Sequence, residues 1–501
     1  MQRREFLRTA ALSGLAATAT PQNSAQQTPT NGKPLNFVFI LIDDMGWRDV
    51  GFSGSRYYRT PNIDALAARG MRFSNAYAAC PVCSPTRAAI MTGKYPARLG
   101  ITNFLPGRHT LPHSKLRGTD PKQYLPLEEV TIAEELKTLG YVTAAIGKWH
   151  LGGVRYYPEK QGFDVNVGGT DKGSPKSYFY PQWSGNPPVD GNYGEYLTDR
   201  LTRAAEDFIQ SHAEKPFFLY LAHYGVHIPF EAGADAVARY RRNIRQDEPQ
   251  NNPVYAAMVE SIDESVGRVV KKIDTLGLTE NTVFIFTSDN GGLDAAEGKG
   301  EKATSNAPLK GGKGHLYEGG IREPLCIVWP GVTKPRSQSD FPVISTDFYP
   351  TITQMAGIGR PMGRPVDGVS LVPLLKGQAA LKREALYWHY PHYSNQGGRP
   401  GAAMRAGDWK IIRWYEDDSV SLYNLKTDPG EKTDLATTDP ERAAAMKAKL
   451  NKWLDGLPIE MPTPNPDYDK DAETEGLAEA IREQLKLGEL PTPVAAPQSG
   501  K

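Results

Sequence analysis

The sequence predicts an α/β fold: a large, mainly parallel sheet with helices on both faces, followed by a small C-terminal α+β subdomain with an antiparallel sheet. Three observations lead to this prediction. Short apolar runs of strand length alternate with amphipathic helices through the first three quarters of the chain. Past about residue 375, short strand candidates instead follow one another closely, separated by turn residues. A chain of 501 residues is also longer than one hydrophobic core usually supports.

In the large sheet, strands are predicted at residues 35–42, 141–146, 217–222, 282–287 and 325–329. Helices are predicted at residues 61–69, 83–92, 131–139, 196–210 and 254–276. Thr131 and Glu134 have the spacing of a capping box, and Gly140 ends the helix that they begin. The helix at 254–276 carries its apolar residues on one face, which is typical of a helix packed on a sheet.

The C-terminal region predicts strands at residues 385–390, 402–406, 410–415 and 419–422. Asp439 as N-cap and Pro440 in the first turn predict one helix through residue 453. We therefore expect four parts: a signal and linker at 1–33, the α/β domain at 34–375, the antiparallel subdomain with its helix at 376–460, and a Pro-rich tail at 461–501.

The N-terminus has the pattern of a twin-arginine export signal. Arg3 and Arg4 precede an apolar run at residues 10–17, and small residues suited to cleavage follow at 17–19. The run is shorter than the ~20 residues of a spanning helix, and no later stretch reaches that length. We expect an exported protein, periplasmic or extracellular, that uses the twin-arginine translocation machinery and has no stable membrane anchor.

Composition excludes some classes of partner. The chain has 58 Lys and Arg against 57 Asp and Glu, so no basic field exists to attract nucleic acid. Three cysteines cannot provide a disulfide framework for a chain of this size. Cys80 and Cys83 also form a C-x-x-C pair, but a redox site does not explain the spacing of Pro85 and Arg87, so Cys80 is expected to fill the core.

The segment that begins at Cys83 places a thiol at the start of a helix. Pro85 suits the first helical turn, and Gly93 suits the position after the last. Unpaired N–H groups at a helix N-terminus favour anions such as sulfate or phosphate.

This segment resembles the signature of the type I sulfatases. It has the pattern C-x-P-x-R at 83–87 and ends in Thr92-Gly93, and residues 140–150 resemble the second signature of the same family. The resemblance implies an arylsulfatase-like member of the alkaline phosphatase superfamily, a sulfuric ester hydrolase in which Cys83 is converted to formylglycine by a maturation enzyme. One hydroxyl of the hydrated aldehyde attacks sulfur and displaces the alcohol, and the other then expels sulfate and restores the aldehyde.

Polar residues follow four predicted strands, where ligands bind in open α/β sheets. They are Asp43 and Asp44, Lys148 and His150, His227, and Asp289 and Asn290. The acidic pairs offer only oxygen ligands, which suits a hard divalent cation, and calcium is the expected one. By the resemblance, one Ca²⁺ per chain is held by Asp43, Asp44, Cys83, Asp289 and Asn290.

The resemblance also assigns the catalytic roles. Arg87 and Lys148 hold the hydrate and its developing charge, and His150 assists the second hydroxyl as a base. Lys148, His227 and Lys313 contact the sulfate, and His227 or Lys313 protonates the leaving alcohol. A core histidine and a solvated lysine are the ordinary alternatives for His227 and Lys313, whereas Glu318 and Arg322 are expected to form a structural pair.

The stretch at residues 387–399 is dense in aromatic residues and His. Aromatic faces, amides and Arg suit sugar rings and hydroxyls, so we expect His389 and His392 to line the pocket mouth, with Asn306 nearby. A packed strand and turn is an equally good interpretation.

The expected substrate is therefore a sulfate monoester on a sugar from a sulfated polysaccharide. Two alternatives remain open: a phosphonate or phosphate monoester hydrolase of the same superfamily, and a non-catalytic binder of sulfated glycans in which Cys83 is never converted.

Overall fold

The computed structural model describes residues 32–108, 110–297, 301–359, 365–470 and 472. The predicted export signal falls mainly in residues 1–31, outside this part. Within it, no helix combines the length and the apolar character needed to cross a membrane.

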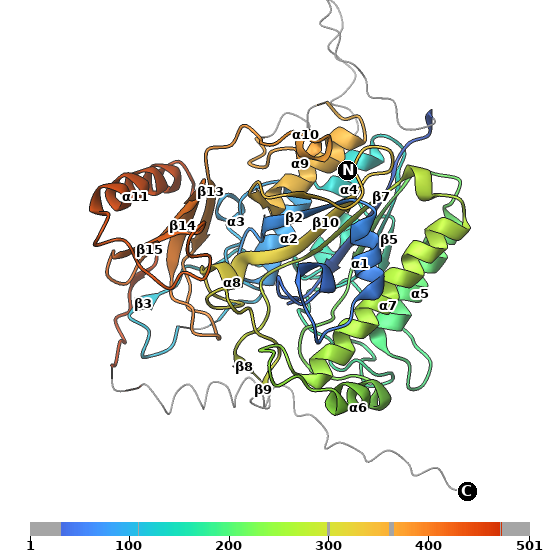
Figure 1. The fold of residues 1–501 in the computed structure, drawn as a ribbon, viewed down its shortest axis with the longest axis horizontal. Coiled ribbons are helices and arrows are strands. Elements are labelled where there is room, and N and C mark those ends of the chain that lie inside the picture. Colours follow the sequence, from blue (N-terminus) through green and yellow to red (C-terminus); the bar gives the residue numbers. More distant parts are fainter. Residues whose placement is uncertain (1–31, 109, 298–300, 360–364, 471, 473–501) are drawn as a thin grey trace, which may run out of the picture.

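A nine-stranded sheet forms the centre of the molecule (Figure 1). Its order is β11-β2-β10-β7-β1-β6-β4-β5, with β12 beside β2. The strands are β1 (Asn36–Ile42), β2 (Met71–Tyr77), β4 (Val142–Gly147), β5 (Val165–Val167), β6 (Phe217–Ala222), β7 (Thr282–Ser288), β10 (Arg322–Val328), β11 (Ser337–Ser339) and β12 (Val343–Ile344). The five strands from β7 to β5 are parallel to one another, whereas β10 is antiparallel to both β7 and β2.

Helices cover both faces of this sheet, as the sequence predicts. The helices of this part of the chain are α1 (Pro61–Ala68), α2 (Cys83–Thr92), α3 (Pro96–Leu99), α4 (Ile132–Lys137), α5 (Leu197–Ser211), α6 (Ala234–Arg242), α7 (Pro253–Thr275), α8 (Glu318–Ile321), α9 (Phe348–Met355) and α10 (Val372–Leu375). Short 3-10 turns occur at Gly51–Ser53, Val154–Tyr156, Pro158–Lys160, Thr279–Asn281 and Ser345–Asp347.

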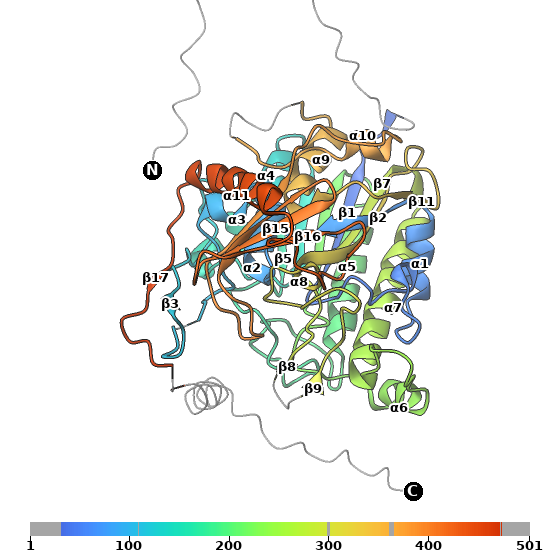
Figure 2. The same cartoon turned by 60° about the vertical axis from the view of Figure 1, so that its left-hand side comes forward.

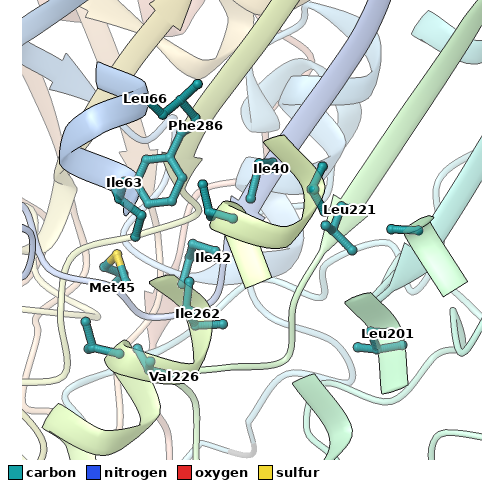
Figure 3. Packing of buried hydrophobic residues seen from close by; sticks show 14 of the residues in the cluster. Ile40, Ile42, Met45, Ile63, Leu66, Leu201, Leu221, Val226, Ile262 and Phe286 are labelled. Atoms are coloured by element: carbon teal, nitrogen blue, oxygen red, sulfur yellow. The ribbon is translucent and has the colours of Figure 1, made fainter. Parts of the chain in front are cut away.

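Every residue of β1 is buried, because alternate side chains enter two different cores. Ile40 and Ile42 pack with α1, α5 and α7 on one face (Figure 3), while Phe39 and Leu41 pack with α2, α4 and α9 on the other. In the long helix α7, the predicted apolar face is buried except for Val270, which is half-buried. The central strand is therefore held from both sides, which fixes the position of the residues that follow it.

The C-terminal region forms a second sheet, of four antiparallel strands, covered by one helix (Figure 1). Its elements are β13 (Leu386–Tyr390), β14 (Gly401–Ala406), β15 (Trp409–Trp414), β16 (Val420–Asn424) and α11 (Pro440–Asp455). Asp439 caps α11 by accepting a hydrogen bond from the N–H of Arg442 at 3.2 Å, as predicted.

Two small sheets complete the described structure: β3 (Leu116–Arg117) with β17 (Thr463–Pro464), and β8 (Ala296–Glu297) with β9 (Glu301–Lys302). Figure 2 shows β17 beside β3, away from the four-stranded C-terminal sheet. The first residues of the predicted tail thus lie along the surface, with Asn465 donating to the carbonyl of Ser114 at 2.9 Å.

A buried ionic cluster joins the two sheets. Lys410 on β15 lies 3.0 Å from Glu318 on α8 and 2.9 Å from Glu431, with all three side chains buried. Glu318 also pairs with Arg322, so these two residues form the structural pair that the sequence predicts. Cys80 is buried, as predicted for a core-filling residue, and burial raises the pKa of its thiol.

Candidate active site

The carboxyl ends of four neighbouring parallel strands meet at one edge of the large sheet. In the order β7-β1-β6-β4, Ile42 lies opposite Ser288 and Gly147 lies opposite Ala222. The polar residues predicted to follow these strands are thereby brought to one place, although about 245 residues separate the first pair from the last. This meeting depends on the strand order, which places β1 between β7 and β6.

Asp43 lies at the centre of this edge and is fully buried. Its Oδ2 accepts a hydrogen bond from Nζ of Lys148 at 2.7 Å, and Nη2 of Arg87 lies 3.9 Å from its Oδ1. Burial raises the pKa of Asp43 well above its usual value despite the charge of Lys148, and the neighbouring carboxylates of Asp289 and Asp44 raise it further. Burial is therefore the main reason why the ionised form of Asp43 is disfavoured.

Asp44 is buried beside it and has a left-handed backbone conformation, with φ of 62°. Such a conformation is uncommon outside glycine and is often found at functional sites. Its Oδ2 accepts from Nζ of Lys313 at 2.8 Å, and its Oδ1 accepts from the amide of Asn290 at 2.8 Å. Burial alone would raise the pKa of Asp44, but Lys313 holds it well below its usual value.

Asp289 and Asn290 follow β7, which is next to β1 on the side opposite to β6. One oxygen of Asp289 accepts from the backbone N–H of Asp44 at 3.2 Å, and the other accepts from Arg87 at 2.9 Å. Both oxygens are therefore already engaged. The side-chain oxygen of Asn290, in contrast, is buried and has no hydrogen-bond partner in the described structure, and the same is true of Oδ1 of Asp43.

These residues fit a hard divalent cation. Buried oxygens without a partner are costly, and a cation would satisfy them. In the described residues, the atoms of Asp43, Asp44 and His227 that could bind a metal lie within 4.8 Å of one another. The imidazole of His227 is therefore also close enough to bind a metal, although His227 is not among the predicted ligands. Whether Cys83 and Asp289 are ligands stays a prediction.

Cys83 is the first residue of α2, as its segment predicts. Val82 precedes it in an extended conformation, and the helix ends at Gly93, whose φ is 69° and whose N–H donates to the carbonyl of Ala89. Every residue of α2 is buried, and Cys83 itself is only 3% exposed. The helix therefore holds the thiol rigidly at the sheet edge.

His150 faces this thiol. Its Nδ1 lies 3.4 Å from Sγ of Cys83, and its Nε2 lies 2.6 Å from the carbonyl oxygen of Leu105. A carbonyl only accepts, so the Nε2 carries the proton and the lone pair of Nδ1 points to position 83. Burial, assisted by Lys148, holds the pKa of His150 well below its usual value, and the ring is neutral. This is the state required of a base.

Arg87 lies one helical turn after Cys83 and is also fully buried. Its guanidinium binds Asp289 and donates to the carbonyl of Lys148 at 2.8 Å. Burial opposes its charge, but Asp289 and the other neighbouring groups, Asp43 among them, together outweigh this and raise the pKa of Arg87. Arg87 thus connects α2 to the ends of β4 and β7.

His227 and Lys313 both approach the Oδ2 atom of Asp44. The Nδ1 of His227 lies 3.0 Å from the carbonyl of Ile228, which leaves Nε2 facing Asp44 Oδ2 at 3.6 Å. Burial and then the charge of Lys313 hold the pKa of His227 well below its usual value. A neutral imidazole would turn a lone pair toward a carboxylate here, which again favours a cation between them.

The three residues predicted to bind a sugar are all buried. Asn306 uses its amide to bind both backbone groups of Gly292, at 3.2 and 2.9 Å. His389 lies 2.7 Å from the hydroxyl of Tyr415, and His392 lies 2.9 Å from the hydroxyl of Thr102. His392 lines a small cavity, described below. Contact of these residues with substrate stays a prediction.

Asp49 is a residue of the site region that the sequence analysis missed. It is fully buried, and its Oδ2 accepts from the N–H of Gly46 at 2.8 Å and from the hydroxyl of Tyr255 at 2.6 Å. These bonds fix the loop that carries Asp43 and Asp44. Tyr255 lies on the apolar face of α7, so no local pattern identifies it as the partner of Asp49.

Comparison with known proteins agrees with this geometry. A family model described as Sulfatase matches residues 35–358, and one described as N-sulphoglucosamine sulphohydrolase, C-terminal, matches residues 312–458. A sulfatase of Formosa agariphila is 32% identical over 88% of this chain and 92% of its own. Human N-acetylgalactosamine-6-sulfatase is 33% identical over 85% of this chain and 78% of its own. Among solved structures, Ps i-CgsB in complex with k-i-k-neocarrahexaose is 29% identical, covers 92% of this chain and 98% of its own, and has a TM-score of 0.71.

Proposed function

Because the chain belongs to the sulfatase family and is a sulfuric ester hydrolase, we propose that it removes sulfate from a sulfated sugar by means of a formylglycine formed from Cys83. The observation that carries the proposal is the position of Cys83. It begins a buried helix, lies 3.4 Å from a neutral imidazole, and is one helical turn from a buried arginine.

The hydrated aldehyde would supply two hydroxyls at position 83, one to attack sulfur and one to release sulfate afterwards. His150 removes a proton from a hydroxyl there, because its Nδ1 lone pair points to that position. Arg87 and Lys148 stabilise the negative charge that develops in the reaction. Both are held in place by carboxylates, Arg87 by Asp289 and Lys148 by Asp43, so no reorganisation is needed.

One Ca²⁺ fits the buried oxygens of Asp43, Asp44 and Asn290, with His227 within reach, and would polarise the S–O bond of the ester. Lys313 and His227 both approach Oδ2 of Asp44, and one of them protonates the leaving alcohol. Lys313 also binds a sulfate oxygen through its charge.

Two observations support a sugar substrate. The relatives named above include an N-acetylgalactosamine-6-sulfatase and a protein in complex with k-i-k-neocarrahexaose, as their names state. His392 lines a cavity together with Asn103, which is two residues from Leu105, the hydrogen-bond partner of His150. The N-terminal sequence supports export by the twin-arginine machinery to the periplasm or beyond, with residues 34–375 as the catalytic domain.

The experiment that tests the proposal is peptide mass spectrometry across residues 79–87 of protein from its native host. We expect an aldehyde at position 83 and an unmodified thiol at Cys80, which serves as an internal control in the same peptide. A thiol at both positions would contradict the proposed nucleophile.

The second measurement compares hydrolysis of sulfate and phosphate monoesters of one phenol. We expect the sulfate ester to be preferred and Cys83→Ala to abolish its turnover. A preference for phosphate would favour the phosphonate or phosphate hydrolase. Binding of sulfated glycans with no turnover of either ester would favour the non-catalytic binder.

A further inference from the structure

A cavity of about 180 Å³ lies between the loop that follows α3 and the turn that follows β13. Its walls include Asn103, Arg108, Gly118, Asp120, His392 and Tyr393. We call it the Arg108 pocket. None of the roles proposed above uses it, except that His392 was predicted to contact the substrate.

Arg108 is the informative residue of this pocket. Its guanidinium is partly buried, and burial lowers its pKa. Within the described residues it has no ion pair and no hydrogen bond, whereas the pocket's other arginine, Arg117, pairs with Asp467. A partly buried cation without a counterion is unfavourable, and a bound anion would offset this cost. Asp120, the pocket's acidic residue, is exposed.

The pocket is joined to the active site by its own loop. Leu105 accepts the hydrogen bond from Nε2 of His150, and its N–H donates to the hydroxyl of Ser84, next to the nucleophile. The hydroxyl of Tyr390 donates to Asn103 at 3.4 Å. Asn103, in the pocket wall, and Leu105, beside the site, thus lie two residues apart on one loop, which supports a substrate that reaches both.

The walls of the pocket are fixed. His392 binds Thr102 at 2.9 Å, and burial lowers the pKa of His392 to about 3, so it is a neutral polar wall. On the outer side, β17 pairs with β3, and Asn465 binds the carbonyl of Ser114. Arg108 therefore supplies the unbalanced positive charge in a preformed cavity.

We propose that the Arg108 pocket binds a second anionic group of the substrate, a sulfate or a carboxylate on the sugar whose sulfate ester reacts at position 83 or on the adjoining sugar. This inference rests on the proposed function, since it places the reacting ester at Cys83. Arginine suits the role because its planar fork binds either oxyanion through two hydrogen bonds. The protein then selects multiply charged glycans over singly sulfated ones.

The test uses three matched disaccharides: one with a single sulfate, one with an added sulfate and one with an added carboxylate. For the wild-type enzyme we expect kcat/KM to be about tenfold or more higher with an added anion, in line with a hydrogen bond to a charged group. The carboxylate and sulfate arms show which anion the pocket takes. In Arg108→Gln this preference disappears, while turnover of a small aryl sulfate with no second charged group stays within about twofold.

Arg239→Gln is the matched control, because it removes the same charge from the exposed surface of α6 and should leave the preference intact. Arg108→Lys, which keeps the charge but loses the fork, should retain part of the preference. If the wild type turns over aryl sulfate but an added anion gives no advantage that depends on Arg108, the inference is overturned.

Calorimetric binding to the Cys83→Ala variant separates this inference from the proposed function. We expect each doubly anionic disaccharide to bind about tenfold more weakly when Arg108 is also replaced by Gln. Such a loss without turnover of any sulfate ester by the wild type would reject the proposed function and retain the pocket. Equal binding with and without Arg108 would reject the pocket alone.

Discussion

Gly173 lies directly against the imidazole of His150. A Cβ at this position would be 2.5 Å from Cε1 of the ring and 2.8 Å from Nε2, closer than such atoms approach. Gly173→Ala therefore has to displace the ring from its contacts with Cys83 and Leu105. We expect kcat/KM for an aryl sulfate to fall by about tenfold to a hundredfold, since small misplacements of catalytic groups are costly.

The control for this change is Gly153→Ala, where a Cβ meets no atom within 4 Å and φ is −71°. That variant should keep wild-type activity. Unchanged activity in Gly173→Ala, with both proteins folded to the same extent by circular dichroism, would show that the position of His150 does not limit the reaction.

The unpartnered oxygens of Asp43 and Asn290 predict a stabilising effect of calcium. After chelation, added Ca²⁺ at about a hundredfold over its dissociation constant should stabilise the fold by about 2.7 kcal/mol, seen as a higher melting temperature. Asn290→Ala should need more Ca²⁺ for the same rise, while Asn192→Ala, on the exposed surface, should match the wild type. A melting temperature insensitive to chelator and to Ca²⁺ would reject the metal site.

At the residue scale, the sequence predicts the groups that follow a strand but not the groups that hold them. Asp43, Lys148, His227 and Asp289 are visible because apolar runs end just before or near them. Asp49 and Gly173 are not, since their partners Tyr255 and His150 lie elsewhere in the sequence and meet them only through tertiary packing.

At the element scale, the capping box of α4 gives a measurable prediction. The hydroxyl of Thr131 accepts from the N–H of Glu134 at 3.2 Å, and the Glu134 carboxylate accepts from the N–H of Thr131 at 2.9 Å. Thr131→Ala should lower the free energy of unfolding by about 1–2 kcal/mol. Urea denaturation measures this change in the free energy of unfolding.

Thr138→Ala at the other end of the same helix is the control. Its side chain is exposed and caps no N-terminal N–H group, so we expect a change within about 0.5 kcal/mol. Equal losses in the two variants would mean that the cap contributes nothing specific.

Elements with a strong local signal were predicted closely. The strand at 217–222 has the predicted bounds, and the long helix differs by one residue at each end. Several elements were not predicted from the sequence, among them β2, α6 and α9. In α9, Pro350 looks like a helix breaker, yet it lies in the first turn, where a missing N–H has no intrahelical partner to lose. Helix α6 has only one buried residue, Tyr240, and three arginines in its last turn. Its sequence therefore lacks the apolar face by which a helix is recognised.

At the scale of the whole molecule, the two sheets are coupled by Lys410, Glu318 and Glu431. Burial raises the pKa of Glu431 to about 7, and the nearby Glu318 contributes, whereas the usual value is 4.5. Between these values the folded protein binds a proton that the unfolded chain has lost. The stability from this group is therefore present at low pH and is lost as pH rises through about 7.

Glu431→Gln should remove this slope, because its amide cannot titrate. We expect the free energy of unfolding of the variant, relative to the wild type, to rise between about pH 4.5 and pH 7. Glu318 and Lys410 do not titrate in this window, since the pKa of the first is lowered and that of the second is raised. Urea titrations across the window measure the difference, and a constant difference would contradict the assignment.

The mainly parallel sheet and the separate antiparallel sheet were both predictable from the spacing of strands and helices. The antiparallel direction of β10 was not predictable, because a buried strand has the same apolar pattern in either direction. The reversal has a structural consequence, since it brings α8 and the segment of Lys313 to the same sheet edge as Asp44.

The burial of Cys83 sets an order of events during biosynthesis. At 3% exposure, and within a helix buried at every position, the thiol is out of reach of another enzyme once α2 has packed. If Cys83 is converted as proposed, the maturation enzyme has to modify the newly made chain before α2 is enclosed. If the protein crosses the membrane already folded, a chain that folds before modification is exported with its thiol intact. The yield of active protein then depends on the rate of modification relative to the rate of folding.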